Sequence, residues 1–404
     1  MRTLTYWLSV ALVFTIPFKE LLVLPEVGSL SLLLGLAVAG CWVVAVTYSG
    51  VIRPVGIFHL AAFGFFLWNF LSILWSIDAD DSMARALTYA RMALFIWMIW
   101  DLYDSRGKIW SAAQAYVLGA WINLGSVLYN FLNGIEAYRF AHGRFTATGF
   151  NTNETGLLLA LGLPLAWYLI ISKPLGERVP LVLRWLNFLY LPVGLFGIVL
   201  TASRGSMLAT LPVFIAVLLT LPETHRAQRR LFILGIVIAG IAMFNLVPDE
   251  SLQRLGTTGE EISANDLNGR VDVWEDGFEI FTENMLIGTG ANTFRKAVDS
   301  GKAPHNVFMA IAVDVGLIGL TLFILVLSIV FFSLLRYPFL EQMIWLVLVL
   351  AWLTGSMVGN WEYENVSWLF LCLIVRGASL RVHIQSSTNE RHPPLAKMPL
   401  ASAK

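Results

Sequence analysis

The chain has 404 residues, of which 57% are hydrophobic and 13% are charged, and its 27 basic and 27 acidic residues give a formal net charge of zero. Soluble globular domains carry about 25% charged residues, so this composition excludes a soluble enzyme, a disordered chain and a strongly basic nucleic-acid-binding protein. It predicts an all-α polytopic integral membrane protein whose single membrane domain spans residues 1–404. The two cysteines both lie in apolar stretches, which excludes a disulfide framework and a cysteine metal site.

Apolar stretches recur along the whole chain. A helix needs about 20 mostly apolar residues to cross the hydrocarbon layer of a bilayer, and about twelve stretches approach or meet this length. The first is short, but its positive region is the single residue Arg2 and it lacks the small-residue cleavage pattern of a signal peptide, so we expect it to remain as a span. The expected spans are 5–18, 28–47, 55–76, 86–103, 110–131, 156–172, 182–200, 204–221, 230–247, 305–334, 340–358 and 366–379.

The orientation of these spans follows from the Lys and Arg residues in the short loops. With both termini in the cytoplasm, 16 of the 27 basic residues fall in short cytoplasmic segments, in agreement with the positive-inside rule. The opposite orientation would place the basic cluster His225-Arg226-Ala227-Gln228-Arg229-Arg230 outside. We therefore expect both termini to lie in the cytoplasm.

Two external segments, at about 132–155 and 248–304, hold most of the other 11 basic residues. The second is the large periplasmic loop of the expected topology, and loops of this length in compact proteins are usually functional. Its amphipathic run from Trp274 to Phe281 predicts short helices rather than irregular chain. The polar segment 382–404 is expected to form a disordered cytoplasmic tail.

His305 is the main candidate for acid–base chemistry. It follows Pro304 at the end of the long loop, and proline favours the first turn of a helix, so we expect His305 at the external N-terminus of the tenth span. The partial positive charge there favours a nearby phosphate and a neutral imidazole, which can accept a proton. The alternative is a histidine that only caps a membrane helix.

Arginines on the same side are candidate ligands for an anionic substrate, because the guanidinium group binds phosphate oxygens in a bidentate manner. Arg204 separates two apolar spans with almost no loop, and a charge at that depth is usually functional. Its alternative role is to reach lipid headgroups. Arg270 lies in the long loop, where an ordinary solvated charge is the alternative. Arg139 and Arg144 alternate with aromatic residues just outside the fifth span.

Several other catalytic motifs are missing from the sequence. It contains no Walker loop, no His-Glu-x-x-His and no Gly-x-Ser-x-Gly. The tract Asp78-Ala79-Asp80-Asp81 resembles a metal-binding carboxylate cluster, but such a tract is more typical of a solvated turn. A histidine with several external arginines therefore indicates acid–base chemistry on an anionic, membrane-embedded substrate.

A spaced motif begins at His305 and continues into the tenth span. It consists of His305-Asn306, nine further residues, and then Gly316-Leu317-Ile318-Gly319. This spacing resembles the motif of the bacterial O-antigen ligases and the related O-antigen polymerases, and the similarity extends over residues of about 70–320. Weaker similarities to the family lie in Leu71-Ser72-Ile73-Leu74-Trp75-Ser76, in Gly143-Arg144 with Gly149-Phe150-Asn151, in Leu200-Thr201-Ala202-Ser203-Arg204-Gly205, and in Gly269-Arg270 with Trp274 and Gly288-Thr289-Gly290.

The resemblance implies a membrane-embedded glycosyltransferase that uses no metal or other cofactor. Its donor would be a polysaccharide linked to undecaprenyl pyrophosphate, its acceptor a sugar of the lipid A-core oligosaccharide, and its active site would face the periplasm from the bacterial inner membrane. We expect His305 to take the proton of the acceptor hydroxyl in an inverting displacement. Arg204 and Arg270, with Arg144 and Arg139, are expected to bind the pyrophosphate. Membrane lipids are the remaining expected partners, and no nucleic acid is expected.

The resemblance leaves the acceptor open. An O-antigen polymerase would use the same donor with a second undecaprenyl-linked repeat unit as acceptor, although the span count and the compact histidine motif favour the ligase. A protein-glycosylating relative often has additional exported sequence at its C-terminus, whereas a structural scaffold would leave the external arginines without a role. A lipid-linked glycan transporter would require paired discontinuous helices and internal symmetry, and the sequence shows no repeat.

Overall fold

The computed structural model describes residues 1–404 except 25–27, 138–142, 173–178, 224–225, 257–269 and 392–404. The described residues form an α-helical bundle with one short antiparallel pair of strands, in which Val23 pairs with Ser29 and Leu24 with Gly28. The long helices are α1 (Arg2–Thr15), α2 (Leu30–Ser49), α3 (Ile57–Leu71), α4 (Ala79–Leu102), α5 (Arg106–Leu132), α6 (Thr152–Ile171), α7 (Leu181–Leu200), α8 (Arg204–Thr220), α9 (Arg226–Leu246), α14 (Val307–Leu334), α15 (Phe339–Ser356) and α16 (Asn365–Arg391). The shorter elements are η1 (Ile16–Phe18), β1 (Val23–Leu24), β2 (Gly28–Ser29), η2 (Ser72–Leu74), η3 (Leu221–Glu223), α10 (Asp249–Gly256), α12 (Arg270–Glu283) and α13 (Phe294–Ala297).

Each apolar stretch expected to span the membrane coincides with one of the long helices. Eight helices in the described part of the chain are long and apolar enough to cross a membrane, and Arg2–Phe18 and Arg204–Thr220 form shorter apolar helices. The all-α, multi-pass architecture is therefore confirmed, whereas the number of crossings remains a prediction. The long loop carries α10, α12 and α13, so the expectation of short helices in this loop is also confirmed.

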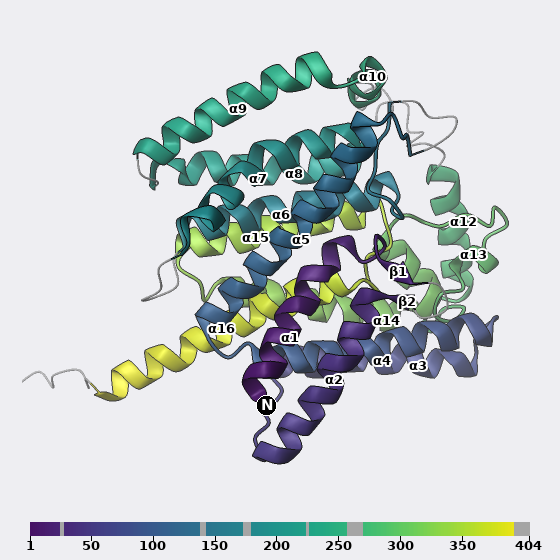
Figure 1. Ribbon diagram of the computed structural model, residues 1–404. Helices are drawn as coiled ribbons and strands as arrows, with labels where there is room; N and C mark the ends of the chain where they lie inside the picture. The colour runs from purple at the N-terminus through teal and green to yellow at the C-terminus, as the bar shows by residue number, and fades with distance from the viewer. Residues whose placement is uncertain (25–27, 138–142, 173–178, 224–225, 257–269, 392–404) are drawn as a thin grey trace, which may run out of the picture.

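The two ends of the bundle differ in what they carry (Figure 1). Helices α12 and α13 lie at one end, whereas Met1 lies at the opposite end. Helix α16 continues to Arg391, so the first ten residues of the expected disordered tail are helical. The rest of that tail, 392–404, lies outside the described residues.

Ion pairs to buried or partly buried carboxylates hold together the end that contains Met1. The Asp101 carboxylate is fully buried in α4 and pairs with Arg2 at 3.0 Å and with Arg53 at 3.4 Å. The Trp42 indole N–H also donates to it, at 2.9 Å. Farther along the same end, Glu341 of α15 pairs with both Arg106 and Arg381. Asp104 and Lys108 form a further ion pair here. We call this end of the bundle the Asp101 end.

Helix α14 is interrupted at Gly316, which has φ +68° and ψ −169°. This left-handed conformation favours glycine, and a side chain here would collide with the backbone of Leu286. The segment 285–290 fits against the interruption and forms hydrogen bonds with the backbone groups that the helix leaves open. Thr289 N–H donates to Val313 O at 2.9 Å, and Leu317 N–H donates to Met285 O at 2.8 Å.

Candidate active site

His305 lies directly before α14 and not inside it. The helix is capped by Asn306, whose side chain accepts hydrogen bonds from Phe308 N–H at 3.0 Å and Met309 N–H at 3.2 Å. The expectation that Pro304 would occupy the first helical turn is therefore wrong. Asn306 is the N-cap, a position that asparagine favours, and the helix begins at Val307. His305 has φ +47°, a backbone conformation that is costly for a non-glycine residue and is concentrated at functional sites.

The residues before His305 are held by α12. The Trp274 indole N–H donates to Pro304 O at 2.7 Å. Val273 and Gly277 of the same helix are buried, and Val273 packs in an apolar cluster with Phe294 and with Val313 of α14. The long loop thus folds back on α14 and fixes the position of the histidine.

The pKa of His305 is lowered from its usual value of 6.5. Partial burial is the largest cause, and the guanidinium groups of Arg270 and Arg295 add electrostatic repulsion of the protonated form. The side chain nevertheless remains accessible. At neutral pH the imidazole is therefore uncharged, which is the form that can accept a proton.

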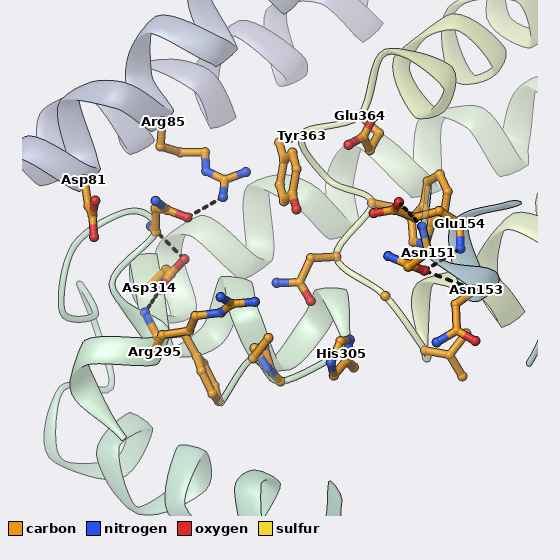
Figure 2. Close-up of a pocket in the computed structure, with 18 of the residues that line it drawn as sticks. Asp81, Arg85, Asn151, Asn153, Glu154, Arg295, His305, Asp314, Tyr363 and Glu364 are labelled. Carbon is orange, nitrogen blue, oxygen red and sulfur yellow. Dashed lines mark hydrogen bonds between the residues drawn. The ribbon is translucent and has the colours of Figure 1, made fainter. Parts of the chain in front are cut away.

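His305 lines a cavity of about 690 Å³ at the end of the bundle that carries α12 and α13. Figure 2 shows Arg85, Arg295 and Asp314 on one side of this cavity, Asn151, Asn153 and Glu154 on the other, and His305 between them. We call it the His305 cavity, and we call this end of the bundle the cavity end. The size and the converging polar groups are those of a substrate site.

One wall of the His305 cavity carries three cations. Arg85 of α4 stacks on the Tyr363 ring, with 3.7 Å between its guanidinium carbon and the ring centroid, and it also donates to the Asn292 side chain. Lys296 is paired with two carboxylates of the α4 N-terminus. Arg295 forms no ion pair with any residue that the structure describes. The carboxylates Asp81 and Asp314 lie on the same wall (Figure 2), so Arg295 is its most available positive charge for an anion.

The opposite wall consists of amides and carboxylates. Asn151 caps α6 and accepts from Glu154 N–H at 2.9 Å, and the Glu154 carboxylate accepts from Asn151 N–H at 3.3 Å. Ser203 donates to the Asn153 side chain at 2.8 Å. The loop between α15 and α16 adds Asn360, Trp361 and Glu364. Such groups accept hydrogen bonds from hydroxyls, so this wall suits sugar hydroxyls better than phosphate.

Of the arginines expected from the sequence, Arg270 has the clearest relation to His305. It begins α12 and its charge contributes to the lowered pKa of His305. Its own pKa is lowered by burial and by Arg254. Arg204 begins α8, and its Nε donates to Arg254 O at 2.8 Å. Arg204, Arg254, Arg270 and His305 therefore form a series of neighbours, although only His305 lines the cavity.

Arg144 occupies a different position. Its guanidinium donates to Thr201 O at 3.2 Å and also to the Thr152 hydroxyl at the start of α6. It thus connects the start of α6 with the segment that precedes Arg204. Arg139 lies outside the described residues.

Sequence reasoning did not single out Arg85, Arg295 and Asn360 as site residues. Arg85 and Arg295 belong to the 11 basic residues assigned to the external side, and this assignment could have marked them as candidates.

The tract that resembles a metal-binding cluster instead forms ion pairs. The carboxylates Asp78 and Asp81 bind Lys296 at 2.5 and 2.8 Å. Asp78 also caps α4 by accepting from Asp81 N–H. In the described part of the chain, no group of three or more His, Cys, Asp or Glu residues is arranged to hold a metal ion.

The region that contains His305 is similar in sequence to a known protein family. Residues 188–324, which include Arg204, Arg270, His305 and both glycines of the motif, match the family model described as O-antigen ligase. This region is therefore similar to the O-antigen ligase family. The family resemblance stated from the sequence is thereby confirmed, and with the helical spans it makes the chain a multi-pass membrane protein.

The chain is also similar to a curated protein of polysaccharide production. The chain is 25% identical over 305 residues to the exopolysaccharide production protein ExoQ of Rhizobium meliloti (strain 1021). The alignment covers 69% of this chain and 66% of the relative, just under two thirds of its length.

Proposed function

We propose that this chain is a membrane glycosyltransferase of polysaccharide biosynthesis, and specifically an O-antigen ligase. It would transfer a polysaccharide from undecaprenyl pyrophosphate to a sugar of the lipid A-core oligosaccharide at the periplasmic face of the inner membrane. The observation that carries this proposal is an accessible His305 with a lowered pKa in a large polar cavity, within a region that matches the O-antigen ligase family model.

His305 would act as the general base. Its neutral imidazole takes the proton of the acceptor hydroxyl while the hydroxyl oxygen attacks the anomeric carbon of the donor. The bond between that carbon and the pyrophosphate oxygen breaks with inversion, and the pyrophosphate leaves with the electron pair. Because the pKa of His305 is lowered, the imidazole is already neutral at neutral pH and can accept the proton.

Arg270 and Arg204, together with Arg295, would bind the pyrophosphate and stabilise the charge that develops on it. Arg270 and Arg295 both act electrostatically on His305, which supports their closeness to the reacting centre. Arg144 would act indirectly through its hydrogen bonds to Thr201 and Thr152, by positioning the segment that leads to Arg204.

The second candidate function is that of an O-antigen polymerase. The relative is named for exopolysaccharide production, which favours a growing glycan as the acceptor. The donor chemistry and the role of His305 would be unchanged, and only the acceptor would differ.

Gel analysis of lipopolysaccharide from a deletion strain tests these two functions. Loss of the whole polysaccharide ladder, with accumulation of lipid-linked polymer, is the result expected for the ligase. Core that carries a single repeat unit would instead support the polymerase. An unchanged ladder would contradict both functions. Complementation with the wild-type chain and with His305→Ala, produced at equal levels, shows whether the defect depends on the proposed base.

A further inference from the structure

A second cavity of about 240 Å³ adjoins the His305 cavity. It is many times larger than the roughly 10–15 Å³ that a single water molecule needs. Glu154, Trp361 and Glu364 line both cavities, so the two spaces meet at these residues. We call it the side cavity; its other walls are formed by Ile16, Lys19, Glu20, Gly149, Phe150, Leu158 and Val366.

The charges of the side cavity are unsuited to a phosphate group. Three carboxylates, those of Glu20, Glu154 and Glu364, face a single ammonium group, that of Lys19. This ammonium group is already paired, because Lys19 Nζ lies 2.5 Å from Glu364 Oε2 and 3.8 Å from Glu20 Oε1. An anion would meet excess negative charge here, whereas ionised carboxylates accept hydrogen bonds from uncharged hydroxyl donors.

The other lining groups match the remaining surface of a sugar. The apolar side chains of Phe150 and Leu158 can contact the C–H face of a sugar ring, while the carboxylates bind its hydroxyl edge. On the adjoining stretch of the His305 cavity, the buried side-chain oxygen of Asn360 has no hydrogen-bond partner among the described residues. A buried acceptor without a donor is costly, and a sugar hydroxyl would supply that donor.

The direction of the reaction indicates which sugar belongs here. In an inverting displacement the acceptor oxygen approaches the anomeric carbon from the side opposite to the leaving group. Arg85 and Arg295 lie across the His305 cavity from Glu154 (Figure 2), so a pyrophosphate held near Arg295 directs the acceptor towards the carboxylate wall. The side cavity opens from that wall.

We propose that the side cavity binds an uncharged sugar unit of the acceptor glycan, next to the sugar whose hydroxyl reacts at His305. This proposal rests on the glycosyltransferase function proposed above and adds a substrate class to it: an acceptor with at least two sugar units, of which the one in the side cavity carries no phosphate or carboxylate.

Steady-state transfer by Glu20→Gln in nanodiscs tests the proposal, because this change keeps the side-chain shape and removes one charged acceptor. The substrates are lipid-linked O-antigen as donor and lipid A-core as acceptor. We expect the acceptor KM to rise about 10-fold, since hydrogen bonds to charged groups are the stronger class, while kcat and the donor KM stay within twofold. A shortened acceptor that ends at the reacting sugar should give the same KM for the variant and the wild type.

The matched control is Glu279→Gln, which removes an exposed carboxylate of α12 outside both cavities and should leave both KM values unchanged. A rise in the donor KM of Glu20→Gln would place the donor glycan in the side cavity and overturn the proposal, as would an unchanged acceptor KM. If the wild type does not transfer to lipid A-core, the ligase function is refuted while the proposal for the side cavity is not. The same comparison with a lipid-linked repeat unit as acceptor then tests the side cavity.

Discussion

The Asp101 end and the cavity end of the bundle use their arginines in different ways. At the Asp101 end, Arg2 and Arg53 share the buried carboxylate of Asp101, and Arg106 and Arg381 share the partly buried carboxylate of Glu341. At the cavity end, Arg270 and Arg295 form no ion pair with any described residue. Charge that is neutralised inside the protein stabilises the fold, whereas charge that the protein leaves open is available to a ligand.

This difference changes the meaning of the zero net charge. Four of the arginines that predict orientation from the sequence, Arg2, Arg53, Arg106 and Arg381, form ion pairs within the structure, so we expect these four to stabilise the fold as well. The smaller set on the other side contains the cations that face the cavity. Mutations in the set at the cavity end are therefore expected to change activity, whereas mutations in the set at the Asp101 end are expected to change stability.

Replacement of His305 should produce the largest effect. General acid–base catalysis contributes roughly 10²–10⁴-fold to a rate, so His305→Ala should lower kcat by about this factor in a reconstituted transfer assay. Thermal stability should remain close to that of the wild type. The exposed neighbour Lys302 provides a control, since Lys302→Gln should retain most activity. Near-normal transfer by His305→Ala would refute the assignment of the base.

Removal of the Arg270 guanidinium should lower the rate by roughly 10²–10³-fold, the usual cost of losing one donor to a developing negative charge. Arg270→Lys keeps the charge but loses the planar fork, so it should recover only part of the activity. The measurement is kcat at saturating donor. Full activity of Arg270→Gln would show that this charge serves structure rather than chemistry.

At the Asp101 end the effect should appear in stability instead. Asp101→Asn leaves Arg2 and Arg53 without their shared buried carboxylate, and it should lower the free energy of unfolding by about 1–3 kcal/mol. Thermal unfolding in detergent measures this loss, and kcat per folded molecule should stay within twofold of the wild type. A large loss of kcat with unchanged stability would break the contrast between the two ends.

The smallest effect should be on the pH dependence of transfer. Because the pKa of His305 is lowered, the acid limb of the pH–rate profile should lie below pH 6.5. Arg295→Gln removes a positive charge that disfavours the protonated imidazole, so the limb should move to higher pH, by less than about 1 unit. A shift to lower pH, or no shift, would contradict the proposed closeness of Arg295 to the histidine.

The sequence was sufficient to predict the helical membrane architecture and the position of His305 near the start of a long helix, because apolar length and local motif spacing are encoded along the chain. It could not predict that Arg85 and Arg295 share one cavity wall, since they lie on α4 and α13 and meet only through tertiary packing. For Arg144, the sequence showed a basic residue among aromatics, whereas its hydrogen bonds to Thr201 and Thr152 depend on the folded loop.

The interruption of α14 at Gly316 makes the segment 285–290 a joint that connects three parts of the site. Its Thr289 O accepts from Ile77 N–H at 2.9 Å next to the start of α4, and its Gly290 N–H donates to Asp314 O at 2.8 Å within α14. The helix that carries Arg85, the loop that carries Arg295 and the helix that follows His305 are thus connected through a few backbone hydrogen bonds. A shift of the backbone in this segment would therefore move the histidine and the two arginines together, whereas a substitution of one cavity side chain leaves these hydrogen bonds in place.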